Sequence, residues 1–522
     1  MSANSSEAAV TAAGDLSVPR VRKYWVLAVV SLTIFMVWVD ATVVNTALPS
    51  IARDFGATNS ELQWIVNSYS LLLAGLLLLG GAVGDRFGRK RSLTAGAIMF
   101  GAASLGASLS TNPEMLIFMR GIQGVGAAFM LPGTLSIISS VFEREERAKA
   151  IAIWAMVGSM AAVAGPALGG SLVDQVGWEA VFWLHVPIDA VIVVGMKMVP
   201  ESKDTRSRPL DITGAMLATI GMLALVFGVV QGGGSGWTSV QIIISFVMGG
   251  SLLGLFWFSQ SRNQYPMLPL RYLTQGEVAG PILVLLILIL AMAGVFFFLT
   301  QYFQLVQGHN ALRAGLYIMP AALTMPIGAT AAARFSRLAG PKLLAVIGGF
   351  VVMGGLGALA LIEVDSNYVL PAIGFALFGL GSGLIMPTVS DTIMAAISPD
   401  DAGIGAAMND TGRELGFALG VAVLGAVLTS LYRTNVTDNL HGLVPADIVS
   451  TIGDSLGSLS AVSGQLVPEV ATTVAAIANQ AFVDAMRVSM FTAIGFVAIA
   501  IVIALIAIPR KVREHQARRV ET

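Results

Sequence analysis

Fourteen apolar segments, each about 20 residues long or longer, dominate this sequence, and each is long enough to cross a bilayer. Backbone groups in lipid must form their hydrogen bonds within their own segment, so such segments fold as helices. We therefore predict an all-α, polytopic membrane protein with 14 transmembrane helices, located in the cell (inner or plasma) membrane. The expected spans are 24–47, 60–83, 92–110, 113–139, 149–171, 178–199, 212–231, 239–259, 278–300, 314–333, 343–362, 369–396, 403–430 and 487–509.

The composition supports this class and excludes others. Hydrophobic residues make up 55% of the 522 residues and charged residues only 12%, which is about half the share of a soluble protein. The net charge of −1 gives no indication of nucleic-acid binding. The chain has no cysteine and only four scattered histidines, so neither disulfides, thiolate chemistry nor a histidine metal site is expected. Residues 1–19 are polar and lack the apolar core of a signal peptide.

The basic residues predict the orientation of the chain. If both termini are cytoplasmic, 24 of the 30 lysines and arginines fall on the inner side. Arg53, Arg313, Arg433 and Arg487 then fall outside, while Arg120 and Arg413 lie within spans. Because inner loops carry an excess of Lys and Arg, this distribution favours an even number of spans.

Three short motifs recur at nearly the same spacing, which indicates two related halves. The segment 123–132 resembles 378–387, 165–169 resembles 416–420, and 84–90 resembles 336–342. Transporters built from repeats place their substrate near the middle of the membrane, between the halves. The predicted organisation is two pseudo-symmetric six-helix bundles, 24–200 and 278–509, with an inserted helix pair and its connectors at 201–277. Residues 1–23 and 510–522 are expected cytoplasmic tails, and 431–486 an outer loop whose helical hairpin lies over the outer face.

Asp40 is an acidic residue inside an apolar span, where a carboxylate costs about 2.5–3.5 kcal/mol on insertion scales. A chain keeps such a residue where it faces a water-filled cavity, a partner or a cation. Asp40 is therefore a candidate site for protons or for cationic ligands. The plainer alternative is a carboxylate that caps a helix end or bonds Thr42 near the interface.

A glycine-rich basic loop follows the second span. Its glycines permit a tight turn, and Asp85 lies among cations with which it can pair. The loop is a candidate conformational latch that breaks when the two halves rock; an ordinary basic inner loop is the alternative. The candidate latch residues are Gly81, Asp85, Arg86, Gly88, Arg89 and Lys90.

This loop resembles the signature of the major facilitator superfamily. The segment Arg120–Gly126 resembles the fourth-helix motif of its proton-coupled antiporters, and Asp40–Pro49 the first-helix motif of the fourteen-helix drug:proton antiporter family. The resemblance implies that Arg120 takes part in proton relay, whereas a structural ion pair between helices is the alternative. A further segment resembles the fifth-helix antiporter motif, a hinge that also permits close helix packing: Gly158, Gly165, Pro166, Gly169 and Gly170.

The thirteenth span carries a second acidic pair. Asp410 and Glu414 are four residues apart and share one helical face, and Arg413 lies between them in sequence. The pair is either satisfied by Arg413 or forms an acidic site that faces Asp40 across a cavity. Paired acids at this spacing resemble those of quaternary-ammonium efflux pumps in the same family.

The resemblance implies a proton-coupled antiporter that exports lipophilic mono- and divalent cationic drugs (quaternary ammonium compounds, dyes and biguanides) by alternating access. Asp40, Arg120, Asp410 and Glu414 are the expected proton-coupling residues; Asp40, Asp410 and Glu414 would also bind substrate. The expected partners are lipophilic cations, protons and membrane lipids, with the chain a monomer and without cofactor or metal. The alternatives are an exporter of a lipid, siderophore or anionic metabolite, and a membrane enzyme or sensor.

Overall fold

The computed structural model describes residues 20–203, 209–397 and 402–509, so the predicted tail residues 1–19 and 510–522 lie outside it. Within these ranges the chain is all-helical and has no strand. The first half consists of α2 (Arg20–Phe55), α3 (Asn59–Phe87), α4 (Arg89–Ser108), α5 (Pro113–Val141), α6 (Arg144–Gln175), α7 (Glu179–Trp183), α8 (His185–Gly195) and η1 (Met196–Met198). The connecting region holds α9 (Ile212–Ser235), α10 (Val240–Arg262) and α11 (Leu270–Leu273).

The second half begins with α12, which is mostly buried. Its elements are α12 (Gly276–Gln301), η2 (Tyr302–Val306), α13 (Ala311–Ala360), α14 (Val369–Ala396), α15 (Ala402–Leu440), α16 (Ala446–Asp454), η4 (Leu456–Ser458), α17 (Leu459–Ser463) and α18 (Pro468–Ala507). Helices α2 to α8 pack with one another, and α12 to α18 do the same. The two groups meet where α3 packs on α15 and α6 packs on α13.

Twelve helices of the described ranges are long and apolar enough to cross a membrane. The expected spans 92–110 and 149–171 coincide with α4 and α6, but of these two helices only the short stretch Lys149–Gly158 reaches comparable apolarity. The count of fourteen spans therefore stays a prediction. The all-helical membrane architecture itself is confirmed.

Glycine and proline explain two interruptions of the helices. Gly340, with a φ of 73°, divides α13 into two spans, and Pro341 follows it. Only glycine adopts this backbone angle without strain, and a proline lacks the N–H that would continue the helix. The span at 178–199 is broken at Leu184, between α7 and α8. Pro187 cannot donate to the carbonyl group of Trp183, which removes a hydrogen bond at this break.

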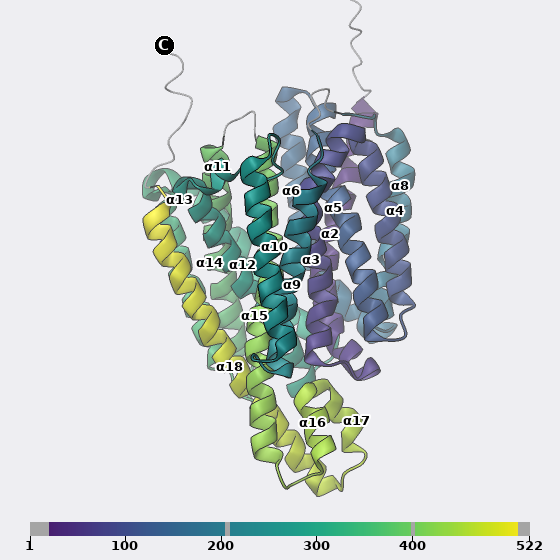
Figure 1. The fold of residues 1–522 in the computed structure, drawn as a ribbon, viewed down its shortest axis with the longest axis vertical. Coiled ribbons are helices and arrows are strands. Elements are labelled where there is room, and N and C mark those ends of the chain that lie inside the picture. The colour runs from purple at the N-terminus through teal and green to yellow at the C-terminus, as the bar shows by residue number, and fades with distance from the viewer. Residues whose placement is uncertain (1–19, 204–208, 398–401, 510–522) are drawn as a thin grey trace, which may run out of the picture.

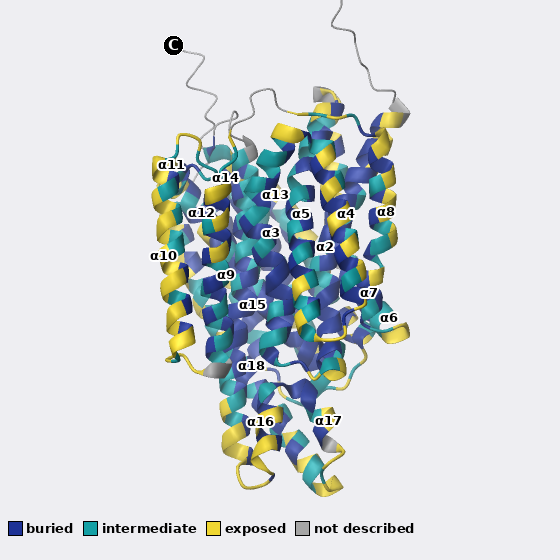
Figure 2. Cartoon of the chain, turned by 45° about the vertical axis from the view of Figure 1, so that its right-hand side comes forward, coloured by how far each residue is buried: buried dark blue, intermediate teal, exposed yellow. Residues whose placement is uncertain are grey.

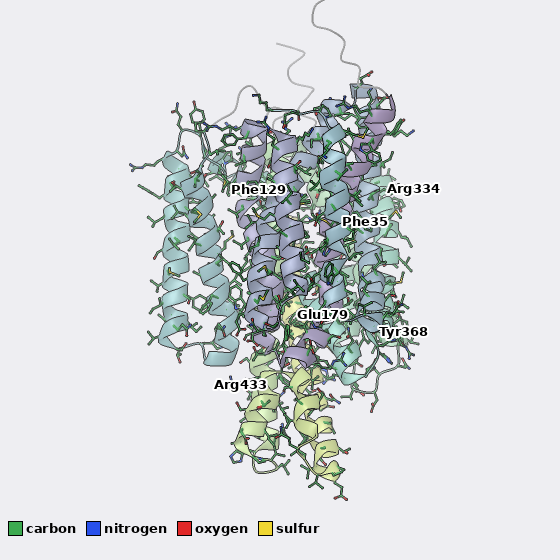
Figure 3. The ribbon with its side chains drawn as sticks, turned by 90° about the vertical axis from the view of Figure 1, so that its right-hand side faces the viewer. Phe35, Phe129, Glu179, Arg334, Tyr368 and Arg433 are labelled. Carbon is green, nitrogen blue, oxygen red and sulfur yellow. The ribbon has the colours of Figure 1, made fainter. Side chains whose placement is uncertain are left out.

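Helices α2 and α18 place the beginning and the end of the described chain at the same end of the molecule (Figure 1). We call this the terminal end and the opposite one, where α16 and α17 protrude, the hairpin end. Arg334 lies toward the terminal end and Tyr368 toward the hairpin end (Figure 3).

The predicted outer hairpin has a different form from the one expected. The segment 470–485 belongs to α18, a single 40-residue helix, and α15 also continues beyond the bundle to Leu440. The hairpin therefore projects away from the bundle rather than lying over its face (Figure 1). No proline or glycine interrupts residues 469–494, so the helix continues.

Helices α9 and α10 pack on each other at the edge of the molecule (Figures 2 and 3), and α9 contacts α3 and α15. The outer face of α10 is apolar and exposed, with Ile244, Val247 and Phe258 each more than half exposed. Such a surface suits contact with lipid.

Candidate functional site

The two charged residues predicted in the first and fourth spans form one buried ion pair. Nη1 of Arg120 lies 2.7 Å from Oδ2 and 2.9 Å from Oδ1 of Asp40, and the two side chains are 2% and 0% exposed. The pair joins α2 to α5. Thr42 donates to the carbonyl groups of Trp38 and Val39, so the alternative in which Asp40 bonds Thr42 is not seen.

Further hydrogen bonds hold the guanidinium of Arg120 in place. Its Nε donates to the carbonyl oxygen of Ile65 at 3.1 Å, and Nη1 also donates to Oε1 of Gln123 at 2.9 Å. Gln123 in turn donates to Ser104 on α4 at 2.7 Å. The guanidinium carbon lies 4.4 Å from the ring centre of Tyr69. Arg120 of α5 therefore contacts α2 and α3 directly and is linked to α4 through Gln123, and such a network fixes the position of Asp40.

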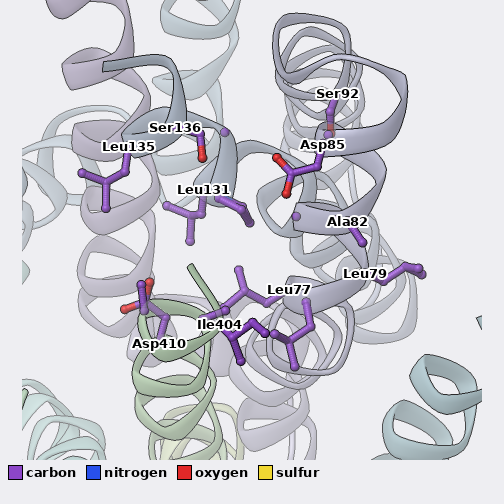
Figure 4. A pocket seen from close by; sticks show the side chains of 18 of the residues that line it. Leu77, Leu79, Ala82, Asp85, Ser92, Leu131, Leu135, Ser136, Ile404 and Asp410 are labelled. Atoms are coloured by element: carbon purple, nitrogen blue, oxygen red, sulfur yellow. The ribbon is translucent and has the colours of Figure 1, made fainter. Parts of the chain in front are cut away.

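A cavity of about 440 Å³ extends between the two halves. Its deep part is lined by Trp38 and Tyr69 from the first half and by Asp410 and Glu414 from the second. Several of its other lining residues, among them Asp85, Ser92 and Asp211, lie at the terminal ends of their helices. Figure 4 shows Asp85 and Asp410 on different helices around this space. The cavity thus runs from the middle of the bundle toward the terminal end.

Arg413 lies over an aromatic ring in the cavity. Its guanidinium carbon is 4.3 Å from the ring centre of Trp38. Among the described residues, no ion pair within 4.0 Å joins Arg413 to Asp410 or Glu414. The alternative in which Arg413 directly satisfies these acids is therefore not seen. Among the residues that the structure describes, the Asp410 carboxylate accepts a single hydrogen bond, from Nδ2 of Asn409 at 3.4 Å.

Asp40 itself does not line the cavity, although its neighbours Trp38 and Ala41 do. Its carboxylate is fully covered, whereas Asp410 and Glu414 line the deep part of the cavity. A direct contact between Asp40 and a molecule in this cavity would require the surrounding side chains to move.

The predicted latch residues lie together at the terminal end of α3 and α4. Asp85 pairs with Arg89 at 2.8 Å, within the loop, and Gly88 adopts a φ of 118°. The backbone N–H of Lys90 donates to Glu201 at 3.0 Å, and Arg86 lies over the ring of Phe87. These contacts stay within the first half and its connector. Gly81 approaches Pro132 of α5.

The predicted hinge residues bring α6 close to two neighbouring helices. A Cβ atom at Gly165 would lie 1.9 Å from Oγ1 of Thr42, and one at Gly169 would lie 2.4 Å from Oγ1 of Thr46, both on α2. Gly158 packs on the same helix near Ile34. A Cβ at Gly170 would lie 2.5 Å from the backbone of Ala311 on α13, and Pro166 approaches Gly315 of that helix. The motif therefore serves close packing within and between the halves.

Three acidic or basic residues that were not predicted as site residues lie near these contacts. Asp174 accepts hydrogen bonds of 2.9 Å from the backbone N–H groups of Ala311 and Leu312, which joins α6 to α13 at the hairpin end. His185 and Asp189 are buried on α8, and Nε2 of His185 lies 3.8 Å from Oδ1 of Asp40. Asp189 lies inside the expected span 178–199 and, like Asp40, is recognisable from the sequence as a charge within an apolar segment.

Comparison with solved structures supports the fold. The chain resembles a bacterial homologue of the human lysosomal transporter Spinster in an inward-facing, occupied conformation, with a TM-score of 0.62 and 17% identity. The match covers 93% of this chain and 96% of that one. A nucleoside transporter, NupG, matches with a TM-score of 0.54 and 13% identity over 91% and 99% of the two chains. At these identities the likeness concerns the fold alone.

Curated relatives match at higher identity and over most of their length. The multidrug efflux pump LfrA of Mycolicibacterium smegmatis is 35% identical over 463 residues, 88% of this chain and 91% of the relative. The methyl viologen resistance protein SmvA of Salmonella typhimurium is 31% identical over 483 residues, 90% and 95% of the two chains. The family model described as Major Facilitator Superfamily matches residues 30–421. The chain therefore belongs to the Major Facilitator Superfamily.

Proposed function

We propose that this protein exports lipophilic cationic drugs in exchange for protons. Its relatives are named as drug efflux or resistance proteins, which supports the general activity. One of them is named for resistance to methyl viologen, a flat organic dication, which supports cations as the substrate class. We further propose that residues 24–200 and 278–509 rock as two bundles, with 201–277 beside them and the terminal end in the cytoplasm.

The observation that supports a cationic substrate most directly is the position of the Arg413 guanidinium in the cavity. Arg413 lies over the face of Trp38, and two carboxylates, Asp410 and Glu414, line the same space. Aromatic faces attract cations through the ring quadrupole, and nearby carboxylates add charge complementarity. A flat organic cation that enters from the cytoplasm would find the same groups. In this proposal Asp410 and Glu414 bind substrate, and they exchange protons when it leaves.

We assign Asp40 and Arg120 to proton coupling and not to substrate contact, because Asp40 is covered in this conformation. As an ion pair the two charges compensate each other, and a proton that binds Asp40 would release Arg120 from it. The Arg120 side chain contacts α2 and α3 and is linked to α4 through Gln123, so its release would disturb packing across the first half. In this proposal, protonation of Asp40 changes the arrangement of the helices around Arg120.

Proteoliposomes that contain the purified chain provide the test. Ethidium efflux is followed after a pH jump in the wild type, in Asp40→Asn, and in a double variant with Asp410→Asn and Glu414→Gln. We expect Asp40→Asn to abolish pH-driven efflux, and the double variant to lose ethidium binding. Asp438→Asn, an exposed residue of the hairpin, is the matched control and should behave like the wild type.

Two results would reject the assignment. Full pH-driven efflux by Asp40→Asn would remove Asp40 from proton coupling. Undiminished ethidium efflux by the double variant would remove Asp410 and Glu414 from substrate binding.

A further inference from the structure

Two ionisable residues of α8, His185 and Asp189, are buried and take no part in the cycle proposed above. Their side chains are 0% and 3% exposed. Within the described chain, both ring nitrogens of His185 lack a hydrogen-bond partner, and so do both carboxylate oxygens of Asp189. The residues are one helical turn apart and share one face of α8. A buried polar group without a partner is costly, so its retention calls for a physical explanation.

His185 lies next to Asp40, and both His185 and Asp189 pack against α4. Nε2 of His185 is 3.8 Å from Oδ1 of Asp40, and its ring packs edge-on against Phe100 of α4 at 5.5 Å. Asp189 packs against Gly101 of α4, where an added Cβ atom would lie 3.0 Å from Oδ2. A side chain at position 101 would occupy the space that the carboxylate uses.

Few other charged groups face this pair. Asp40 faces it from α2, with Arg120 of α5 on the far side of Asp40. The basic residues of α4 are Arg89, Lys90 and Arg91, ten or more residues before Gly101 and so at least about 15 Å away along the helix. Lys197 of η1 and Glu179 of α7 lie eight and ten residues from Asp189, near the two ends of the span.

Asp40, Arg120, His185 and Asp189 form one buried cluster whose net charge depends on how many protons it holds. Asp40 and Asp189 contribute two carboxyl groups, and Arg120 contributes one guanidinium that stays protonated in proteins. Arg120 compensates Asp40, with which it makes its close contacts. An ionised Asp189 would then be an unpaired buried charge, which proteins avoid by neutralising the group. The cluster is neutral only when it holds one additional proton, on Asp189 or on His185.

We propose that His185 and Asp189 form a proton-holding site joined to Asp40, and that this site exchanges one proton in each transport cycle. When Arg120 leaves Asp40, one ring nitrogen of His185 gives its proton to Asp40, and the other ring nitrogen accepts the proton of Asp189. His185 stays neutral overall, Asp189 becomes the carboxylate and Asp40 the acid, so the total charge is unchanged. The proposal rests on the proton coupling proposed above and adds a second N-terminal proton site to it.

Steady-state accumulation tests the proton count. Proteoliposomes are held at zero membrane potential with potassium and valinomycin, and a pH difference of about one unit is imposed across the membrane. The limiting ratio is the steady-state ratio of the ethidium concentrations on the two sides of the membrane. Loss of one coupled proton lowers the limiting ratio about tenfold under these conditions. We expect this drop in Asp189→Asn, with ethidium binding retained, and no drop in the control Asp438→Asn. A limiting ratio equal to that of the wild type would overturn the proposal.

Infrared spectroscopy tests the proton itself, and does so in the resting protein. We expect the wild type at neutral pH to show the C=O stretching band of a protonated, buried carboxyl group. Measured in the background Asp410→Asn/Glu414→Gln, which removes the two other acids that hold protons in the proposed cycle, the band should disappear on Asp189→Asn and remain on Asp438→Asn. A band that persists in Asp189→Asn would place the proton elsewhere and overturn the assignment.

Two more variants keep the test decisive if Asp189→Asn fails to fold. Asp189→Glu retains a carboxyl group and should retain both the band and the coupling. His185→Gln should retain the band but lose the coupled proton, because an amide does not relay protons as imidazole does; normal coupling in His185→Gln would exclude the proposed route. The proposed function has a separate readout, since it fails if Asp40→Asn keeps pH-driven efflux.

Discussion

The buried ion pair between Asp40 and Arg120 makes the stability of the protein sensitive to the loss of either partner alone. Both side chains are buried, and each charge offsets the desolvation of the other. Arg120 has further partners in Ile65 and Gln123, whereas the close contacts of the Asp40 carboxylate come from Arg120. Removal of the arginine therefore leaves an uncompensated carboxylate, and removal of both charges does not.

We predict that Arg120→Gln destabilises the protein by about 3–5 kcal/mol, the range for breaking a buried ion pair from one side. The double variant Asp40→Asn/Arg120→Gln should recover part of this loss, because no buried charge is then left without a partner. Thermal unfolding of the two single variants and the double variant, each purified in the same detergent, measures these losses of stability. If the two single substitutions simply add in the double variant, the ion pair does not hold the helices in the way described.

A second prediction concerns the aromatic face in the cavity. Trp38→Leu removes the ring on which a cation can lie, which should weaken ethidium binding by about 1–2 kcal/mol, or roughly 5- to 30-fold in Kd. Trp64→Leu is the matched control, because Trp64 packs against Phe227 and does not line the cavity. Equilibrium binding to purified protein reports both constants. Equal losses in the two variants would mean that the ring of Trp38 is not part of the binding site.

At this scale the sequence indicated the charged residues but not how they pair. Asp40 and Arg120 could each be singled out because a charge inside an apolar span needs a partner. Which partner each has depends on how the helices pack, and 80 residues separate the two. For Arg413 the sequence suggested Asp410, three residues away, whereas the structure directs its guanidinium to Trp38 on another helix.

Among the elements, the contact between α6 and α13 closes the molecule at the hairpin end. Asp174 bonds the first N–H groups of α13, and Gly315 comes so close to α6 that an added Cβ would lie 2.3 Å from the carbonyl oxygen of Pro166. The obstacle is backbone and not the end of a flexible side chain. A larger residue at position 315 can be accommodated only if the two helices separate.

We therefore predict that Gly315→Val shifts the protein toward a state that is open at the hairpin end. Because the chain has no cysteine, spin labels can be attached at Val176→Cys and Leu361→Cys without background. Both positions are well exposed, one near each half's hairpin-side end. The distance distribution should move to longer values. Gly354→Val is the control, since nothing lies within 4 Å of a Cβ there; an unchanged distribution in Gly315→Val would contradict the closure described.

The elements themselves were the most predictable part of the fold. The helices could be predicted from the lengths of the apolar segments, because the thickness of the membrane sets the number of residues needed to cross it. The hairpin was harder to predict. Residues 431–486 extend beyond the part of the molecule that crosses the membrane, and there hydropathy does not indicate where a helix ends. There α15 and α18 continue as helices by local backbone preference and by packing on each other, which a single sequence does not show.

For the whole molecule, the hairpin connects the second half to the first. Its η4 segment packs on the end of α2, and a Cβ atom added at Gly457 would lie 2.8 Å from the Cβ of Ala52. Gly457 belongs to a segment between α15 and α18, whereas Ala52 belongs to the helix that carries Asp40. If the halves rock during transport, this contact has to open in every cycle.

We predict that a disulfide between Ala52→Cys and Gly457→Cys stops transport. The Cβ atoms of a disulfide are about 3.8 Å apart, so the two segments need to separate by only about 1 Å to form it. Oxidised protein should bind ethidium from the terminal end but not export it, and reduction should restore export. Each single cysteine variant controls for the substitution itself. Full export by completely cross-linked protein would show that the contact stays closed throughout the cycle, and that the two halves do not rock apart at the hairpin end.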